Sequence, residues 1–206
     1  MSTGLRTTPL HSSQVSETAE VLARAFVDDP AWLWAIPDGE SRARVLPWFF
    51  RAATRYGLAA GEVHATAGAL EGAAIVLPPP RPHLDSPRLA RAGLWLMPFK
   101  AGLGAFSRFL TMWRTLEDRH KRDVPPQHWY VWLLGVDPAR QGRGLGSNLI
   151  QAVLARADQD GVPCYLDTTQ ERNLRFYGRH GFEVVYEGDF PRGGPHLWTL
   201  RRDPKR

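Results

Sequence analysis

The residues whose types and spacing most clearly indicate a binding site lie in a glycine-rich turn at 140–147, which reads Arg-Gln-Gly-Arg-Gly-Leu-Gly-Ser. Glycine lets the backbone approach a ligand closely and turn its N–H groups toward it. An apolar run at 129–136 precedes the turn and favours a buried strand, and apolar residues at helical spacing follow it. Because a helix start adds unpaired N–H donors and partial positive charge, this unit predicts a phosphate or pyrophosphate site.

Three kinds of phosphate site are built from a strand, a glycine turn and a helix. A P-loop requires a lysine after its last glycine, and this turn has none. A dinucleotide-binding turn reads Gly-x-Gly-x-x-Gly, whereas Gly142, Gly144 and Gly146 alternate and make the turn one residue too short. Asp167 does end the next predicted strand, where a ribose-binding acid would lie, but too little chain follows for a doubly wound sheet. The third kind is an acyl-CoA site.

Two segments resemble the GNAT superfamily of acyl-CoA-dependent N-acyltransferases. Residues 141–146 are similar to its Gln/Arg-x-x-Gly-x-Gly/Ala motif, and residues 173–182 are similar to its Asn-x-x-Phe-Tyr-x-x-x-Gly-Phe segment. The last third of the chain also resembles puromycin N-acetyltransferase and related actinobacterial enzymes, while the likeness before residue 129 is loose. The resemblance implies a GNAT fold, acetyl-CoA as co-substrate, and transfer of an acetyl group to an amine. No metal is expected, because no paired Cys/His spacing suggests zinc.

The resemblance also implies which residues hold acetyl-CoA. The turn would bind the pyrophosphate, and the backbone at 134–136 would pair with the pantetheine arm. Gly135 is expected to form a β-bulge that frees an N–H as an oxyanion donor. The predicted cofactor-binding residues are Leu134, Gly135, Val136, Gln141, Gly142, Arg143, Gly144, Leu145, Gly146, Ser147, Asn173 and Tyr177.

Tyr177 matches the general acid of the family. A phenol with a pKa near 10 can donate a proton to a thiolate whose conjugate acid has a pKa near 8.5. Asn173 lies four residues earlier and therefore on the same helical face, from which it would reach the CoA arm. The structural alternatives are a core tyrosine and a helix-capping asparagine.

The general base is harder to predict, because many GNAT enzymes place a glutamate on the strand before the bulge and residues 129–134 contain no acid. Asp167, at the end of the neighbouring predicted strand, is our choice, although a strand-end acid bonded to backbone or arginine is a structural alternative. A water relay is another possibility. The other candidate bases are Asp28, Asp29 and His128, followed by His120 and Glu171.

The acceptor pocket is predicted from residues around the end of the first helix and in the segment 84–122. Phe26, Asp29, Trp32 and Trp113 are the predicted substrate contacts, with Trp34 as a further candidate, and each also fits a core role. The predicted acceptor is the primary amine of a small molecule, such as an antibiotic or an aminonucleoside-like compound. Peptide or protein acetylation, and a non-catalytic CoA sensor, remain the alternatives.

Composition limits the number of domains, the partners and the compartment to be expected. A chain of 206 residues with 43% hydrophobic residues suits one globular domain. The net charge of +5 is not gathered into a long basic run, so no nucleic-acid partner is expected. Residues 1–14 lack the apolar core of a signal peptide, and no run is long enough to span a bilayer. The single cysteine, Cys164, allows no intrachain disulfide and is expected to be a buried thiol, and a reducing, cytoplasmic compartment is predicted. A monomer and a homodimer both stay open.

Hydrophobic periodicity predicts an α/β fold with a mixed sheet. The β-α-β crossover at 129–168 should pair its strands in parallel, and a helical insertion is expected at 84–122. The GNAT resemblance implies that the rest of the sheet is mostly antiparallel, with helices on both faces. Residues 1–206 are treated as one N-acetyltransferase domain with an acetyl-CoA-binding core at 129–200. Pro47 is expected near the first turns of its helix. The predicted helices are 15–26, 40–56, 147–157 and 171–179, and the predicted strands are 5–8, 62–67, 72–77, 129–136, 164–168, 182–187 and 196–201.

Overall fold

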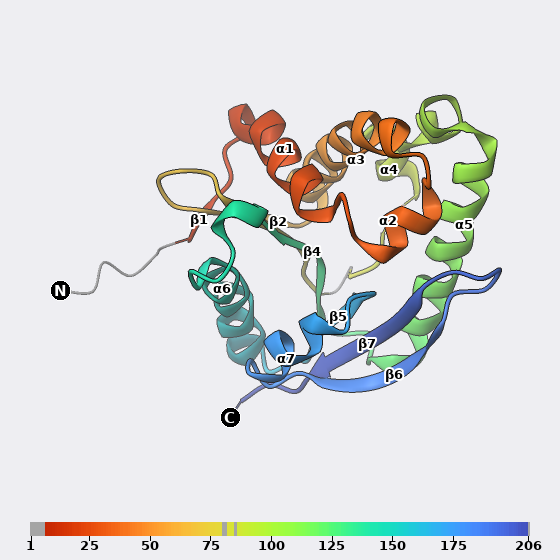
Figure 1. Ribbon diagram of the computed structural model, residues 1–206. Coiled ribbons are helices and arrows are strands. Elements are labelled where there is room, and N and C mark those ends of the chain that lie inside the picture. Colours follow the sequence, from red (N-terminus) through yellow and green to blue (C-terminus); the bar gives the residue numbers. More distant parts are fainter. Residues whose placement is uncertain (1–6, 80–81, 85, 206) are drawn as a thin grey trace.

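One seven-stranded sheet, in the order β1-β2-β3-β4-β5-β7-β6, forms the centre of the molecule (Figure 1). The computed structural model describes residues 7–79, 82–84 and 86–205. Only β4 and β5 pair in parallel, and the other neighbours are antiparallel. The strands are β1 (Thr7–Pro9), β2 (Glu62–Thr66), β3 (Gly72–Leu77), β4 (Trp129–Val136), β5 (Cys164–Thr168), β6 (Glu183–Asp189) and β7 (His196–Arg202).

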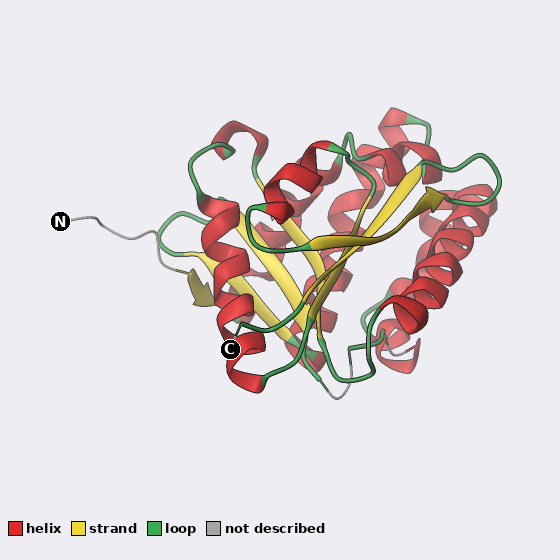
Figure 2. Cartoon of the chain, turned by 90° about the horizontal axis from the view of Figure 1, so that it is seen from below, coloured by secondary structure: helices red, strands yellow, loops and turns green. Residues whose placement is uncertain are grey.

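Helices cover both faces of this sheet (Figure 2). One core cluster joins the sheet to α1, α2, α3 and α5, and a second joins it to α6 and α7. Of the helices described, none is both long and apolar enough to cross a membrane. The helices are α1 (Val15–Phe26), α2 (Pro30–Ala35), α3 (Gly39–Ala60), α4 (Ser86–Arg91), α5 (Met97–Asp123), α6 (Leu145–Asp160) and α7 (Arg172–Gly178).

The central strands supply both cores because successive side chains point to opposite faces. In β3, Ile75 and Leu77 belong to the cluster with α1 and α3, whereas Ala74 and Val76 belong to the cluster with α6. All of β3 is buried, which explains its continuous apolar sequence. Cys164 is also fully buried, as predicted, and burial raises the pKa of its thiol to about 12.

The parallel pair separates before either strand ends. β4 pairs with β5 only through Trp129–Val131 and Cys164–Leu166, although β4 continues to Val136 and β5 to Thr168. Beyond that point β4 keeps its antiparallel partner β3 on one side only. The backbone of residues 132–136 therefore has an edge without a described strand partner in the middle of the sheet, and the walls of both cavities described below include it.

The predicted fold class is confirmed, with several local corrections. α3 runs unbroken through Pro47, which lies well inside the helix; burial of Val45, Leu46 and Phe49 around it offsets the missing N–H. Residues 30–35, left without an assignment, form α2, because Asp29 caps a helix that starts with a proline. Residues 5 and 6 of the predicted first strand, and residues 80–81 of the proline-rich segment, lie outside the described residues.

The segment 84–122 is helical, as predicted; it forms several pieces and belongs to the body of the molecule. α4 is followed by α5, whose helix is kinked at Gly102, where φ is 84°. α5 packs against α2 and α3 on one face of the sheet. The insertion therefore provides a wall opposite β4 and β5.

Candidate active site

An open groove of about 670 Å³ follows the second half of β4, the glycine turn and α7. Gly142 and Gly144 have φ values of 78° and 82°, a left-handed conformation that favours glycine. Gly144 is the N-cap of α6 and supplies no side-chain cap, so the first N–H groups of the helix remain available to a ligand. These amides and the helix dipole suit an anion.

Nearly all the predicted cofactor-binding residues line this groove. The exception is Arg143, which is exposed and does not belong to the lining. Gln141 also stabilises the turn, because its side-chain amide donates to the carbonyl of Val136 at 3.2 Å. The predicted residues that line the groove are Leu134, Gly135, Val136, Gln141, Gly142, Gly144, Leu145, Gly146, Ser147, Asn173 and Tyr177.

Basic residues outside the glycine motif complete the groove. Arg172, Arg179 and His180 come from α7 and the residues after it, and Arg140 comes from the turn. Arg140 forms an ion pair with Glu71 at 3.0 Å, so part of its charge is already matched. The sequence motif did not identify the α7 cations, although Arg172 and Arg179 are seven residues apart, a spacing that places two residues on one side of a helix.

The β-bulge lies three residues earlier than predicted. In the β3–β4 register Leu133 pairs with Ile75 and Val131 pairs with Val76, so Trp132 is the extra residue. Gly135 instead pairs regularly with Ala73. Its lack of a side chain serves packing, because an added Cβ would lie 2.8 Å from Leu22 and 3.0 Å from Ala25 of α1.

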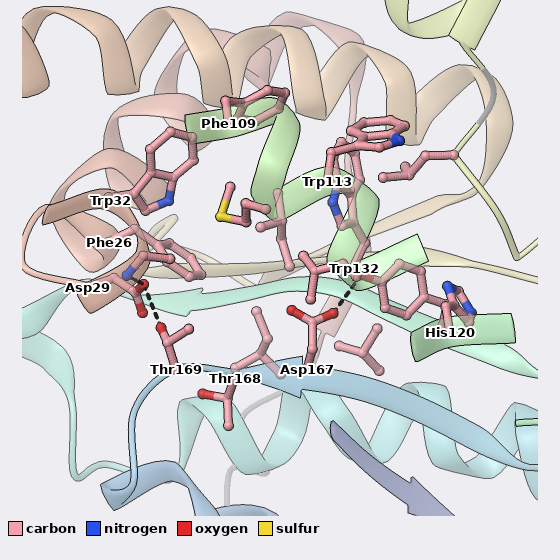
Figure 3. A pocket seen from close by; sticks show the side chains of 18 of the residues that line it. Phe26, Asp29, Trp32, Phe109, Trp113, His120, Trp132, Asp167, Thr168 and Thr169 are labelled. Atoms are coloured by element: carbon pink, nitrogen blue, oxygen red, sulfur yellow. Dashed lines mark hydrogen bonds between the residues drawn. The ribbon is translucent and has the colours of Figure 1, made fainter. Parts of the chain in front are cut away.

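A second, inner pocket of about 140 Å³ lies between the sheet and the helices α2 and α5 (Figure 3). Trp32, Phe109 and Trp113 face Asp167 across it. The four predicted substrate contacts, Phe26, Asp29, Trp32 and Trp113, all line this pocket. Trp34 does not line the pocket; its ring stacks on Phe190, with 6.3 Å between the ring centroids. Further lining residues that sequence reasoning missed are Phe49, Phe109, Met112, Glu117, Tyr130, Trp132, Thr168, Thr169 and Phe190.

Two carboxylates in the inner pocket differ in their hydrogen bonding. The buried Asp29 accepts from the N–H of Ala31 at 3.0 Å, from the Thr169 hydroxyl at 2.9 Å, and from the Gln170 amide at 2.8 Å. It thereby ties the end of β5 to the start of α2. Asp167 accepts one described hydrogen bond, from the Tyr130 hydroxyl at 2.7 Å. Burial, with a smaller contribution from Asp29, raises the pKa of Asp167 to about 6.

The groove and the pocket meet at four shared residues, Phe26, Leu134, Asn173 and Tyr177. Tyr177 is buried, and burial together with the charges of Asp167 and Asp29 raises the pKa of its phenol. Asn173 donates to the Thr168 hydroxyl at 3.0 Å, which fixes its side chain at the junction. The predicted acid therefore lies where the two cavities meet, and the predicted base lines the inner pocket.

The remaining candidate bases are placed less well for proton transfer. Asp28 and Glu171 are exposed and line neither cavity. His128 is buried outside the lining of the pocket, with Nδ1 bonded to the carbonyl of Pro125 at 2.5 Å. His120 does line the pocket, but burial and two nearby histidines lower its pKa to about 2. The pKa of Asp167, about 6, lies nearer to neutrality than the pKa of His120 or that of His128, which burial lowers to about 4.

Comparison with known proteins agrees with this geometry. The model of the Acetyltransferase (GNAT) family matches residues 80–182. An uncharacterized N-acetyltransferase of Schizosaccharomyces pombe is 25% identical over 184 residues, which cover 86% of this chain and 73% of that protein. The N-alpha-acetyltransferase RimI of Mycobacterium tuberculosis is 34% identical over 82 residues, covering 39% of this chain and 52% of RimI.

A solved structure from Corynebacterium glutamicum, described as a histone acetyltransferase HPA2 and related acetyltransferase, shares the fold. Its TM-score is 0.67 at 22% identity, and the match covers 98% of this chain and 97% of that one. This structural likeness confirms the predicted GNAT-type fold. With the family match over residues 80–182, it establishes that the chain belongs to the GNAT family of acetyltransferases, which use acetyl-CoA as co-substrate.

Proposed function

We propose that this GNAT enzyme acetylates the primary amine of a small molecule by direct attack in a ternary complex. The observation that carries the proposal is the junction itself, where Tyr177 and Asn173 line both the groove and the inner pocket. A thioester entering along the free edge of β4 and an amine seated in the pocket would meet there. Bringing both reactants together in this way removes much of the entropic barrier.

The groove would hold acetyl-CoA by its phosphates and by its peptide-like arm. The N–H groups of residues 142–147 and the α7 cations suit the pyrophosphate. The pantetheine amides would pair with the backbone of 134–136, which lacks a described partner on the side of β5. An N–H of this edge is also the proposed oxyanion donor, since a fixed donor stabilises the charge that develops on the carbonyl oxygen.

In the proposed chemistry Asp167 is the base and Tyr177 the acid. With a pKa of about 6 Asp167 is mostly ionised at neutral pH and remains basic enough to accept a proton from the amine. The amine nitrogen bonds to the thioester carbon, and the carbon–sulfur bond breaks as the tetrahedral intermediate collapses. Tyr177, protonated at neutral pH because its pKa is raised, donates its proton to the leaving thiolate. The products are an amide and free CoA.

Aromatic walls favour an acceptor with an apolar body. Phe26, Trp32, Phe109 and Trp113 come from α1, α2 and α5, so the pocket is covered on the side opposite the sheet. Such a pocket suits a compact amine better than a folded protein surface. The resemblance of the last third to puromycin N-acetyltransferase places aminonucleosides among the amines to test.

The alternative acceptor is a peptide N-terminus, which the similarity to RimI over 82 residues favours. One assay separates the alternatives: release of free thiol from acetyl-CoA with aminonucleosides, aminoglycosides, polyamines, arylalkylamines and short peptides. We expect the highest kcat/KM with a small amine that carries an apolar group. Turnover of peptides alone would contradict the small-molecule proposal, and CoA binding without turnover of any amine would indicate a sensor.

A further inference from the structure

Three metal-binding side chains meet at the end of the inner pocket that lies away from Asp29. His83 follows β3, whereas Glu117 and His120 lie three residues apart on α5 and so share one face of that helix. One donor atom of each side chain lies within 4.8 Å of the donor atoms of the other two. Glu117 and His120 also line the pocket, and Figure 3 shows His120 and Asp29 at its opposite ends with Asp167 between them.

The ring of His83 supplies a second sign of a ligand. Its Nδ1 atom is buried and has no hydrogen-bond partner among the described residues. The Oε2 atom of Glu117 lies 3.8 Å away, which is too far for a hydrogen bond. Buried polar atoms normally have a partner, and a nitrogen facing a carboxylate across this distance fits two ligands of one ion.

His128 fixes the protonation of His120. The Nδ1 atom of His128 faces the carbonyl of Pro125 at 2.5 Å, and a carbonyl can only accept, so this nitrogen carries the proton. In the neutral ring Nε2 of His128 is then an acceptor, and it contacts Nε2 of His120 at 2.5 Å. His120 therefore donates from Nε2 and keeps the lone pair on Nδ1. Orientation of a histidine by a hydrogen bond from its other nitrogen is the usual support of a metal ligand.

We propose that His83, Glu117 and His120 bind a divalent transition-metal ion of the zinc type. Two imidazole nitrogens and one carboxylate oxygen form a donor set that zinc accepts. Ligands of a tetrahedral zinc ion lie roughly 3.4 Å apart when the bonds are about 2.1 Å long. The 3.8 Å separation of His83 Nδ1 and Glu117 Oε2 is close to this value, and one donor atom of each of the three side chains lies within 4.8 Å of the others. Three protein ligands leave a fourth position for water or for a donor atom of the acceptor.

The ion would join two segments that are far apart in the sequence. His83 belongs to the segment after β3, and the other two ligands belong to α5, the helix that covers the pocket. Binding would fix that end of the pocket and stabilise the folded state, by an amount that grows with the logarithm of the ion concentration once the site is mostly filled. This inference does not depend on the reaction proposed above, because ion binding is measured without acetyl-CoA or acceptor.

The test uses the full chain without a histidine tag, freed of metal by a chelator and titrated with Zn²⁺ in a calorimeter. We expect one ion per chain and a rise in Tm with Zn²⁺. Co²⁺ should give the intense visible absorption of a tetrahedral site. His83→Ala and Glu117→Gln each remove one ligand and should weaken Zn²⁺ binding by at least about 100-fold, more than loss of a supporting residue does.

A matched control is His64→Ala, because His64 also lies beside a carboxylate, Glu62, at 3.0 Å, but outside the cluster. This variant should bind Zn²⁺ like the unaltered protein. The Tm of each variant without metal reports whether it folds, and the ring of His83 is partly exposed, so its loss should be tolerated. Absence of stoichiometric Zn²⁺ binding to the unaltered chain, or unchanged binding by both ligand variants, would overturn the proposal.

Discussion

The outer groove and the inner pocket share one strand, yet they are built in opposite ways. The groove takes most of its lining from one continuous strand, turn and helix, and it presents mainly backbone amides, glycines and basic side chains. The pocket takes its lining from α1, α2, α5, β4 and β5, and it presents mainly aromatic rings with a few carboxylates. The groove suits a charged ligand whose phosphates and peptide-like arm bind to backbone amides. The pocket suits a ligand that is selected by its shape.

This difference predicts that substitutions on the two sides will have separable effects. A change in the groove should alter affinity for CoA whichever amine is used. A change in the pocket should alter the KM for the amine and leave the affinity for CoA unchanged. Changes at the junction should alter turnover while both ligands still bind.

The largest effect is expected for Gly144→Asp in the groove. A non-glycine residue with φ near 82° costs about 1–2 kcal/mol, and a carboxylate facing the pyrophosphate adds several kcal/mol of repulsion. The Kd for CoA should therefore rise by at least about 1,000-fold in a calorimetric titration. Gly161→Asp is the matched control, because Gly161 also has a positive φ, of 68°, but lies outside the groove. If both variants lost affinity for CoA equally, backbone strain alone would explain the effect.

Asp167→Asn should reduce kcat/KM by about 10²–10³-fold, because an amide cannot accept the proton. In the unaltered enzyme kcat/KM should rise with pH through about 6, where Asp167 ionises, and this rise should be absent in the variant.

The same residue affects stability. Since the pKa of Asp167 is higher in the folded than in the unfolded protein, its ionisation lowers the stability of the folded state as pH rises from about 4 to about 6. The variant should then be more stable at neutral pH, by about 1–3 kcal/mol, so unfolding would not explain its loss of activity. If kcat/KM of Asp167→Asn still rose with pH through about 6, the general base would be another group.

Tyr177→Phe should lower turnover by about 10²-fold while the Kd for CoA changes little, because only the donated proton is lost. Tyr186→Phe is a suitable control, since Tyr186 lies on β6 beneath Arg119 and lines neither cavity. Single-turnover measurements report the chemical step directly. Undiminished turnover would remove Tyr177 from the mechanism.

Trp113→Ala should produce the smallest of these effects, a rise of about 10-fold in the KM for the amine, as expected when an apolar contact worth about 1–3 kcal/mol is lost. Trp95→Ala removes an exposed tryptophan outside the pocket lining and serves as the comparison. Titration with CoA should give the same Kd for both variants. A weaker affinity for CoA in Trp113→Ala would show that groove and pocket are not separable.

The same contrast explains what the sequence could predict. The bounds of α1, β3, β4 and β5 were predicted to the residue, and the glycine turn identified the groove, because these features depend on short-range patterns. The position of the bulge depends on the register between β3 and β4, which local sequence does not specify. A glycine inside a strand favours a bulge at Gly135, whereas the register places it at Trp132. Likewise, the cluster around His83 unites residues from two segments, and no motif marks it.

We propose that acetyl-CoA enters along the edge of β4 that lacks a described strand partner and delivers its thioester to Tyr177 and Asp167. A crystal structure of the protein with CoA would test this binding mode. We expect the pyrophosphate on the N–H groups of residues 142–147, the pantetheine arm against residues 134–136, and the thiol within hydrogen-bonding distance of the Tyr177 hydroxyl. A pyrophosphate bound elsewhere, or a thiol that ends away from the junction of the two cavities, would contradict it.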